Sequence, residues 1–201
     1  MIRVGITGVP GSGKTTLARS LASRCRSEDK IKNVELINEY ARRYISKHGL
    51  ITSILEQYRI LEKQCEWEDS VCNDSLDLMI TDSPVFLGFL YCTELSKSNS
   101  KEIMFFNDIF KKMVKLNFPE PRYDIIFHLP PFFKPVEDGV RAEEHFEDHW
   151  REKSDSMIMS IFQIFKPRVF VVEKAENLED RTNKCLKFIK DYLQMKQRVI
   201  V

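Results

Sequence analysis

The stretch Gly8-Val9-Pro10-Gly11-Ser12-Gly13-Lys14-Thr15 matches the pattern G-x-x-x-x-G-K-[ST]. The apolar run Ile2–Thr7 before it predicts a strand, and the segment Lys14–Arg26 after it predicts a helix. Glycines allow a tight turn and bring backbone N–H groups close to phosphate oxygens without a Cβ in the way. The unpaired amides and the positive dipole end of the following helix point at the same anion. The stretch therefore predicts a phosphate-binding turn, with a purely structural glycine turn as the alternative.

The side chains of this turn indicate which ligand it binds. Lys14 is placed to reach the β- and γ-phosphates of a nucleotide, and the Thr15 hydroxyl is placed to ligate Mg²⁺. ATP and Mg²⁺ are therefore the expected cofactors. The residues expected to bind the nucleotide are Gly8, Gly11, Ser12, Gly13, Lys14, Thr15 and Thr16.

Asp82 follows the apolar run Leu78–Thr81, which predicts a buried strand that ends in a carboxylate. Ligands of a doubly wound sheet bind at the carboxyl ends of its strands, so Asp82 is expected beside the phosphate-binding turn. There it would bind Mg²⁺, directly or through water, or orient an acceptor hydroxyl. The alternative is an N-cap, because Asp82-Ser83-Pro84 also suits the start of a helix.

Glu39 follows a second apolar run, Val34–Asn38, and is expected at the same edge of the sheet. A carboxylate here can accept the proton of a hydroxyl that attacks the γ-phosphoryl group. The alternative is a first-turn acid that offsets the dipole of the next helix. One turn further on, Arg42 is expected to contact the substrate and Arg43 to face solvent.

Residues of about 130–155 predict a lid that closes over this site. Pro130 and the pair Asp138-Gly139 would act as hinges ahead of Arg141 and a charged helical stretch. Closure would exclude water, and Arg141 would neutralise charge on the phosphoryl group during transfer. A surface helix laced with ion pairs is the alternative. The predicted site residues are Lys14, Glu39, Asp82 and Arg141 for catalysis, Glu39, Arg42 and Asp82 for the acceptor, and Thr15 and Asp82 for the metal.

Short aliphatic and β-branched runs alternate with longer helical segments along the chain, which predicts an α/β fold of βαβ units around a parallel sheet. Runs without polar alternation, such as Val169–Val172, predict strands buried on both faces. We therefore expect helices on both faces of the sheet. A length of 201 residues suits a single domain over residues 1–201.

Composition narrows the class of protein. Lys and Arg number 31 and Asp and Glu number 30, and this net charge of +1 argues against a strongly basic coat for nucleic acid. No apolar run approaches the roughly 20 residues of a membrane helix, and the first residues do not resemble a signal peptide. The five cysteines form no C-x-x-C pair, which predicts reduced thiols and a cytoplasmic protein.

The chain resembles the small P-loop kinases that include the ribosylnicotinamide kinase domain of NadR-type proteins and related AAA-type ATP-binding proteins. The resemblance lies in Gly8–Thr15, Asn38-Glu39-Tyr40-Ala41-Arg42, Ile80-Thr81-Asp82-Ser83-Pro84, Tyr123–Phe127 and Asp138-Gly139-Val140-Arg141. It implies a P-loop NTPase fold with five parallel strands in the order 2-3-1-4-5. It also implies MgATP as the donor, and an acceptor site between the second and third strands and the lid. The sequence after Asp82 departs from the Asp-Thr-Asp pattern of the NadR type, which leaves the acceptor open.

The leading prediction is an ATP-dependent phosphotransferase, a monomer or homodimer, that transfers the γ-phosphoryl group to a hydroxyl of a nucleoside or nucleotide-like acceptor. One alternative is a kinase that acts on a hydroxyl within DNA or at a polynucleotide end. For that function a basic track would be formed by Lys111, Lys112, Lys115, Arg42 and Arg43. A second alternative is a regulatory ATPase without a phosphoryl acceptor.

Overall fold

The computed structural model describes residues 1–96, 100–132, 143–174 and 177–199. The strands within these ranges are β1 (Ile2–Gly8), β2 (Val34–Ile37), β3 (Leu78–Asp82), β4 (Ile125–Leu129) and β5 (Val169–Val171). The helices are α1 (Lys14–Arg26), α2 (Tyr40–His48), α3 (Ile54–Ser70), α4 (Val85–Leu95), α5 (Ser100–Asn117), the 3-10 helix η1 (Glu143–Phe146), α6 (Asp148–Phe165) and α7 (Leu178–Val199).

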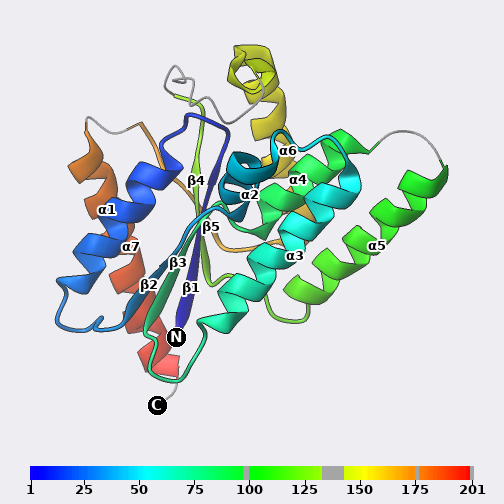
Figure 1. The fold of residues 1–201 in the computed structure, drawn as a ribbon. Helices are drawn as coiled ribbons and strands as arrows, with labels where there is room; N and C mark the ends of the chain where they lie inside the picture. The colour runs from blue at the N-terminus through cyan, green and yellow to red at the C-terminus, as the bar shows by residue number, and fades with distance from the viewer. Residues whose placement is uncertain (97–99, 133–142, 175–176, 200–201) are drawn as a thin grey trace.

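The strands form one parallel sheet in the order β2-β3-β1-β4-β5, which confirms the predicted α/β fold and strand order. In this sheet Ile6 of β1 pairs with Asp82 of β3, and Gly8 of β1 pairs with Leu129 of β4. Parallel strands end at the same edge, so the turns after β1, β2 and β3 meet at the end of the molecule opposite the N-terminus (Figure 1).

Helices cover both faces of the sheet. Helices α1 and α7 lie together on one face, and α3, α4 and α5 lie on the other (Figure 1). Successive residues of β4 point to opposite faces, so Phe127 packs in the same cluster as Leu21 of α1 and Ile189 of α7. Ile126 packs instead with Phe86 of α4. The sheet therefore lies between two apolar layers. The candidate site is formed outside these layers, at the carboxyl ends of the strands.

Two expectations differ from the structure. Strand β5 was expected to be buried on both faces, but it is the edge strand and Val171 is 42% exposed. The charged helical stretch expected after Arg141, from Ala142 to Phe165, is not one helix, because η1 and α6 are separated at Glu147, whose backbone is extended (φ −71°, ψ 138°). Ala142 itself lies outside the described residues.

All five cysteines are free thiols, which agrees with the predicted reduced state. Burial raises the pKa of Cys25, Cys92 and Cys185 to about 12 and that of Cys65 to about 11, so these four are unreactive near neutral pH. Among the described residues, every helix is too short or too polar to span a membrane.

Candidate active site

The turn between β1 and α1 depends on glycine at three positions. Gly8, Gly11 and Gly13 have φ of 143°, 73° and 90°, values that residues with a Cβ rarely adopt. A Cβ on Gly8 would also lie 2.4 Å from the carbonyl oxygen of Leu129. The conformation therefore requires the glycines of the sequence pattern, as a backbone cradle for phosphate does.

Polar groups of the same turn are arranged around its centre. Lys14 is buried, and its Nζ donates to the carbonyl of Val9 at 3.0 Å, so its side chain curls back over the turn. The Ser12 hydroxyl is buried and has no hydrogen-bond partner among the described residues. Helix α1 has Gly13 at its N-cap, so no side chain caps it, and its first turn holds no acid and an exposed Thr16. These donors fit an anion at the start of α1.

Asp82, at the end of β3, contacts the first turn of α1. The Thr15 hydroxyl donates to Asp82 Oδ2 at 2.6 Å. Burial raises the pKa of Asp82, and the negative charge of Glu39 raises it further, whereas Lys14 and the Thr15 hydrogen bond oppose the shift. Thr15 and Asp82 thus present adjacent oxygen atoms, which are the ligand type that Mg²⁺ prefers.

The turn after Asp82 has an unusual backbone. Ser83 has φ of 64°, in the left-handed region, and its N–H donates to the carbonyl of Ile6 at 3.2 Å. The N-cap of α4 is Pro84, so the alternative that Asp82 caps this helix is wrong. Pro84 packs against Gly5 of β1, where a Cβ would lie 3.0 Å from the proline ring. Asp82 therefore does not cap α4, and its carboxylate remains available to the phosphate-binding turn.

Glu39, at the end of β2, occupies the N-cap position of α2 but makes no side-chain cap. Its side chain is 11% exposed, and Glu39 Oε2 lies 3.7 Å from Arg42 Nε. After burial, the negative charge of Glu39 is the next largest cause of the raised pKa of Asp82. The structure therefore brings the two predicted acids together at the edge of the sheet.

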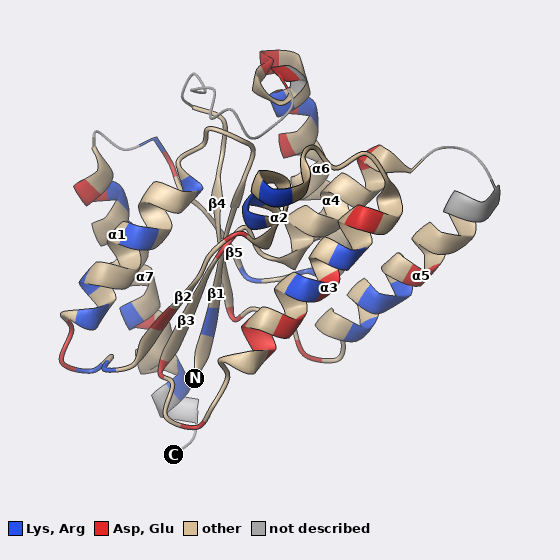
Figure 2. Ribbon diagram, in the orientation of Figure 1, with Lys and Arg blue, Asp and Glu red and all other residues tan. Residues whose placement is uncertain are grey.

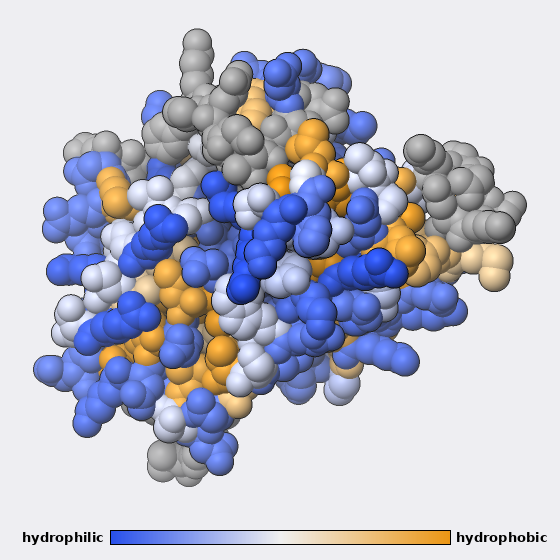
Figure 3. Space-filling model, viewed as in Figure 1, coloured by the Kyte–Doolittle hydropathy of each residue, from blue (hydrophilic) through white to orange (hydrophobic). Residues whose placement is uncertain are grey.

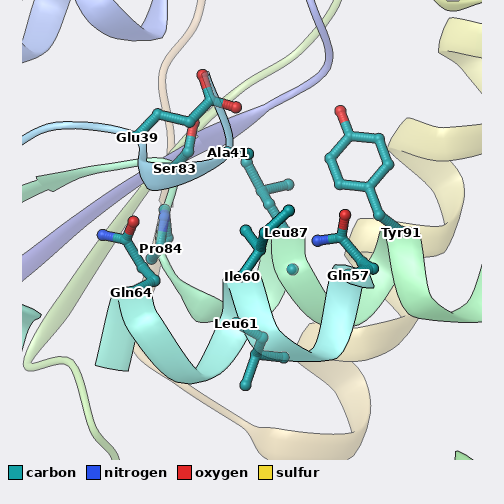
Figure 4. Close-up of a pocket in the computed structure, with 11 residues that line it drawn as sticks. Glu39, Ala41, Gln57, Ile60, Leu61, Gln64, Ser83, Pro84, Leu87 and Tyr91 are labelled. Carbon is teal, nitrogen blue, oxygen red and sulfur yellow. The ribbon is translucent and has the colours of Figure 1, made fainter. Parts of the chain in front are cut away.

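Two neighbouring cavities, of about 30 Å³ and about 500 Å³, adjoin these acids. Glu39, Ala41, Gln57 and Tyr91 line both of them. Ser83 lies beside Glu39 at one side of the smaller cavity and Tyr91 lies at the other (Figure 4). The larger cavity has the size of an ordinary small-molecule site.

Aromatic rings line one wall of the larger cavity. Tyr91 of α4 and Trp150 of α6 have ring centroids 6.3 Å apart and planes 17° apart, and His145 of η1 lies 4.3 Å from Trp150. Leu50 and Ile51 contribute apolar surface from the connection between α2 and α3. Hydrophobic residues gather over this connection, bordered by hydrophilic ones (Figure 3). The wall suits a flat, partly apolar molecule.

Gln57 of α3 is a residue that the sequence analysis did not identify. It is 2% exposed, and its Nε2 has no hydrogen-bond partner among the described residues. Gln57 and Gln64 stand two helical turns apart and project from the same face of α3 toward the smaller cavity (Figure 4). A buried amide without a partner is costly, so this donor is suited to a ligand in the cavity.

Residues 3–181 match the model of a protein family described as an AAA domain. The chain belongs to this family. No curated protein matches the sequence of this AAA domain.

Solved structures share the fold of this AAA domain at low sequence identity. NadR protein in complex with NR gives a TM-score of 0.74 at 19% identity, covering 95% of this chain and 51% of that chain. Deoxyadenosine kinase from M. mycoides with bound dATP gives a TM-score of 0.55 at 14% identity, and the match covers 96% of this chain and 100% of that chain. Thymidylate kinase from Ehrlichia chaffeensis gives a TM-score of 0.59 at 17% identity, and the match covers 94% of this chain and 98% of that chain. The AAA domain therefore has the P-loop kinase fold, and it spans about half the length of the NadR chain.

Some residues predicted for the site lie outside the described part of the chain, and others are paired elsewhere. Arg141 and most of the expected hinge segment lie outside the described residues. Lys111 pairs with Asp108 at 3.1 Å and Lys112 with Glu62 at 2.7 Å. Helix α3 carries acidic and basic residues side by side, and basic residues gather toward the end of α5 (Figure 2). Because two of these α5 lysines are paired with acids, the structure does not favour the basic track of a nucleic-acid kinase.

Proposed function

We propose that the protein is a P-loop kinase that transfers the γ-phosphoryl group of ATP to a hydroxyl of a nucleoside or nucleotide-like acceptor. One arrangement carries this proposal. Glu39 lines a cavity of about 500 Å³ and lies within electrostatic reach of Asp82, which contacts Thr15 of the glycine turn. Donor and acceptor sites would therefore adjoin at a pair of carboxylates. NadR with NR and deoxyadenosine kinase with dATP share this fold, which supports the choice of substrate class.

The donor half of the site fits MgATP. The three glycines and the start of α1 would hold the phosphates, and Lys14 would leave the Val9 carbonyl to reach them. Thr15 and Asp82 would hold Mg²⁺, which supplies charge neutralisation at the β- and γ-phosphate oxygens. No cluster of three or more His, Cys, Asp or Glu among the described residues suits a metal ion. Thr15 and Asp82 alone agree with Mg²⁺, which is commonly bound by one carboxylate together with substrate phosphates.

The two acids are assigned different roles. Asp82 is hydrogen-bonded to Thr15 and faces the donor side, whereas Glu39 lines the acceptor cavity. Glu39 would accept the proton of the acceptor hydroxyl as the new bond from that oxygen to the γ-phosphorus forms. The bond between the γ-phosphorus and the bridging oxygen would break, and ADP would leave. Arg42 and Arg141 are proposed to contact the acceptor and the transferred group, with residues of about 130–155 as the lid.

The acceptor would bind through its ring and its hydroxyl. Tyr91 and Trp150 offer aromatic surface for a planar heterocycle, and the free Nε2 of Gln57 offers a hydrogen-bond donor for its polar edge. Glu39 would receive the sugar hydroxyl. This division suits a base-and-sugar molecule better than an acyclic alcohol.

A screen with γ-labelled ATP and Mg²⁺ tests the function. Nucleosides, nucleoside monophosphates and short oligonucleotides with free hydroxyl ends are each offered, and Lys14→Ala serves as the control. We expect label transfer to at least one nucleoside or nucleotide, abolished in Lys14→Ala. Transfer of label only to oligonucleotides would show that the acceptor is a nucleic acid and not a nucleoside or nucleotide. ATP hydrolysis that no compound affects would contradict the proposal that the protein is a kinase.

A further inference from the structure

A buried polar network lies beneath the two turns that carry the acids, and Glu68 of α3 is at its centre. Glu68 is completely buried and accepts hydrogen bonds from the Tyr123 hydroxyl at 2.9 Å and from Arg122 Nε at 3.0 Å. Gln64 Nε2 lies 3.4 Å from Glu68 and donates to it. Burial raises the pKa of Glu68, while the charge of Arg122 opposes this. Glu68 accepts at each of these contacts, so the oxygen of Gln64 and a lone pair of the Tyr123 hydroxyl remain available to accept from other groups.

The first arm of the network reaches the segment that holds Glu39. Since the Gln64 amide nitrogen donates to Glu68, its oxygen points the other way and accepts the backbone N–H of Tyr40 at 2.9 Å. Tyr40 is the first residue of α2, and Glu39 before it provides no side-chain cap. Gln64 thus caps α2 from a different helix.

The second arm reaches the segment that holds Asp82. The Tyr123 hydroxyl gives its hydrogen to Glu68 and accepts the backbone N–H of Val85 at 3.0 Å. Val85 is the first residue of α4, three residues after Asp82, and Pro84 before it provides no side-chain cap. The start of α4 is therefore capped by Tyr123 from the segment just before β4, as α2 is capped by Gln64 from α3.

We propose that Glu68 is a positioning residue that sets the distance between the two acids. Through Gln64 it anchors the backbone after Glu39, and through Tyr123 it anchors the backbone after Asp82. The inference rests on the proposed function, because it assigns the network to phosphoryl transfer rather than to folding alone. Misplacing reacting groups by about 1 Å can cost on the order of a hundredfold in rate. A shared buried anchor for both acids limits such displacement.

Two single substitutions each cut one arm. Tyr123→Phe removes the hydroxyl between Glu68 and Val85, and Gln64→Met removes the amide between Glu68 and Tyr40. Tyr192→Phe is the matched control, because its hydroxyl donates to Asp124 at 2.9 Å, a carboxylate that is not part of this network.

Backbone amide exchange measured by NMR on the full chain reports the anchors directly. We expect Tyr123→Phe to accelerate exchange at Val85 about tenfold and Gln64→Met to accelerate it about tenfold at Tyr40. Tyr192→Phe should change neither amide. Unchanged exchange at Val85 and Tyr40 in their respective variants would overturn the network itself, whatever the activity of the protein.

Kinetics with the acceptor identified by the labelled-ATP screen report the positioning role. We expect kcat in Tyr123→Phe and Gln64→Met to fall about tenfold or more, with KM for ATP within about twofold, and Tyr192→Phe to match the wild type. Accelerated exchange with an unchanged kcat would reject the positioning role and leave the proposed function intact. Absence of transfer in the wild type would reject the proposed function and the positioning role with it, while the exchange data would still decide whether the network holds the two segments.

Discussion

The Thr15 hydroxyl donates a hydrogen bond of 2.6 Å to Asp82 Oδ2, which joins the first turn of α1 to the end of β3. The two residues are 67 positions apart in the chain and meet because β1 and β3 are parallel neighbours in the sheet. A metal ion that takes both oxygens would replace this hydrogen bond, so the contact marks where the cation is expected.

Substitution of Thr15 tests this site. Thr15→Val keeps the shape of the side chain but removes the oxygen proposed to ligate the metal, whereas Thr15→Ser keeps that oxygen. We expect Thr15→Val to weaken binding of MgATP at least about tenfold and Thr15→Ser to change it less than about threefold. Calorimetric titration with ATP in the presence and absence of Mg²⁺ checks this. Equal affinity for MgATP in the two variants would remove Thr15 as a ligand.

Gly8→Ala is expected to unfold or severely destabilise the protein, and Gly49→Ala to destabilise it mildly. Both glycines have positive φ, but a Cβ at Gly8 meets the Leu129 carbonyl at 2.4 Å while a Cβ at Gly49 meets nothing within 4 Å. We expect losses of more than about 4 kcal/mol at Gly8 and of about 1–2 kcal/mol at Gly49, measured by urea unfolding. Similar losses would mean that the backbone moves to accept the Gly8 clash.

Glu39→Gln is expected to lower kcat at least about a hundredfold while KM for ATP changes less than about threefold. The amide keeps the size of the side chain but accepts no proton, and Glu39 lines the cavity proposed for the acceptor. Steady-state kinetics with varied ATP check this. A proportionate loss of ATP affinity would exclude Glu39 as the base.

Asp82→Asn is expected to stabilise the protein without ligand at neutral pH and to abolish transfer. Burial and Glu39 raise the pKa of Asp82, so the folded state holds its proton to a higher pH than the unfolded state does. The free energy of unfolding therefore falls as the pH rises from the pKa of Asp82 in the unfolded chain through its higher pKa in the folded protein. The neutral side chain of Asp82→Asn does not ionise, so the variant does not lose this stability. Thermal unfolding measured from about pH 4 to pH 8 checks the sign. A lower midpoint in Asp82→Asn at neutral pH would contradict it.

Gln57→Leu is expected to raise stability while weakening the acceptor. The change removes a buried amide nitrogen that has no partner among the described residues, which favours the folded state by about 1–2 kcal/mol. It also removes the donor proposed to face the acceptor ring, so KM for the acceptor should rise about tenfold with KM for ATP unchanged. Unfolding curves and kinetics on the same samples check both effects. An unchanged acceptor KM would show that Gln57 does not face the substrate.

The phosphate turn was predictable from sequence because its causes are local. The positive φ of Gly8, Gly11 and Gly13 requires glycine wherever the turn occurs. Placement of Glu39 and Asp82 at one edge followed from a rule about parallel strands that needs only their positions after apolar runs.

The acceptor cavity was not predictable in the same way. Gln57, Tyr91 and Trp150 lie on α3, α4 and α6, and they meet only because those helices pack on one face of the sheet. Apolar and aromatic residues follow the same helical spacing whether they fill a core or line a cavity. The break at Glu147 was missed for a related reason, since its extended backbone follows no local helix-breaking residue.

Gly5 stands outside the phosphate-binding pattern, yet its bare Cα is what lets the Pro84 ring approach β1. A larger side chain there would press on Ile126 of β4 and on Pro84, just after Asp82, while every residue of the pattern stays unchanged. Position 5, three residues before the first glycine of the pattern, should therefore tolerate few substitutions. A chain that retains the full signature but carries a bulky residue at this position is a candidate for a relative that still binds nucleotide but has lost turnover.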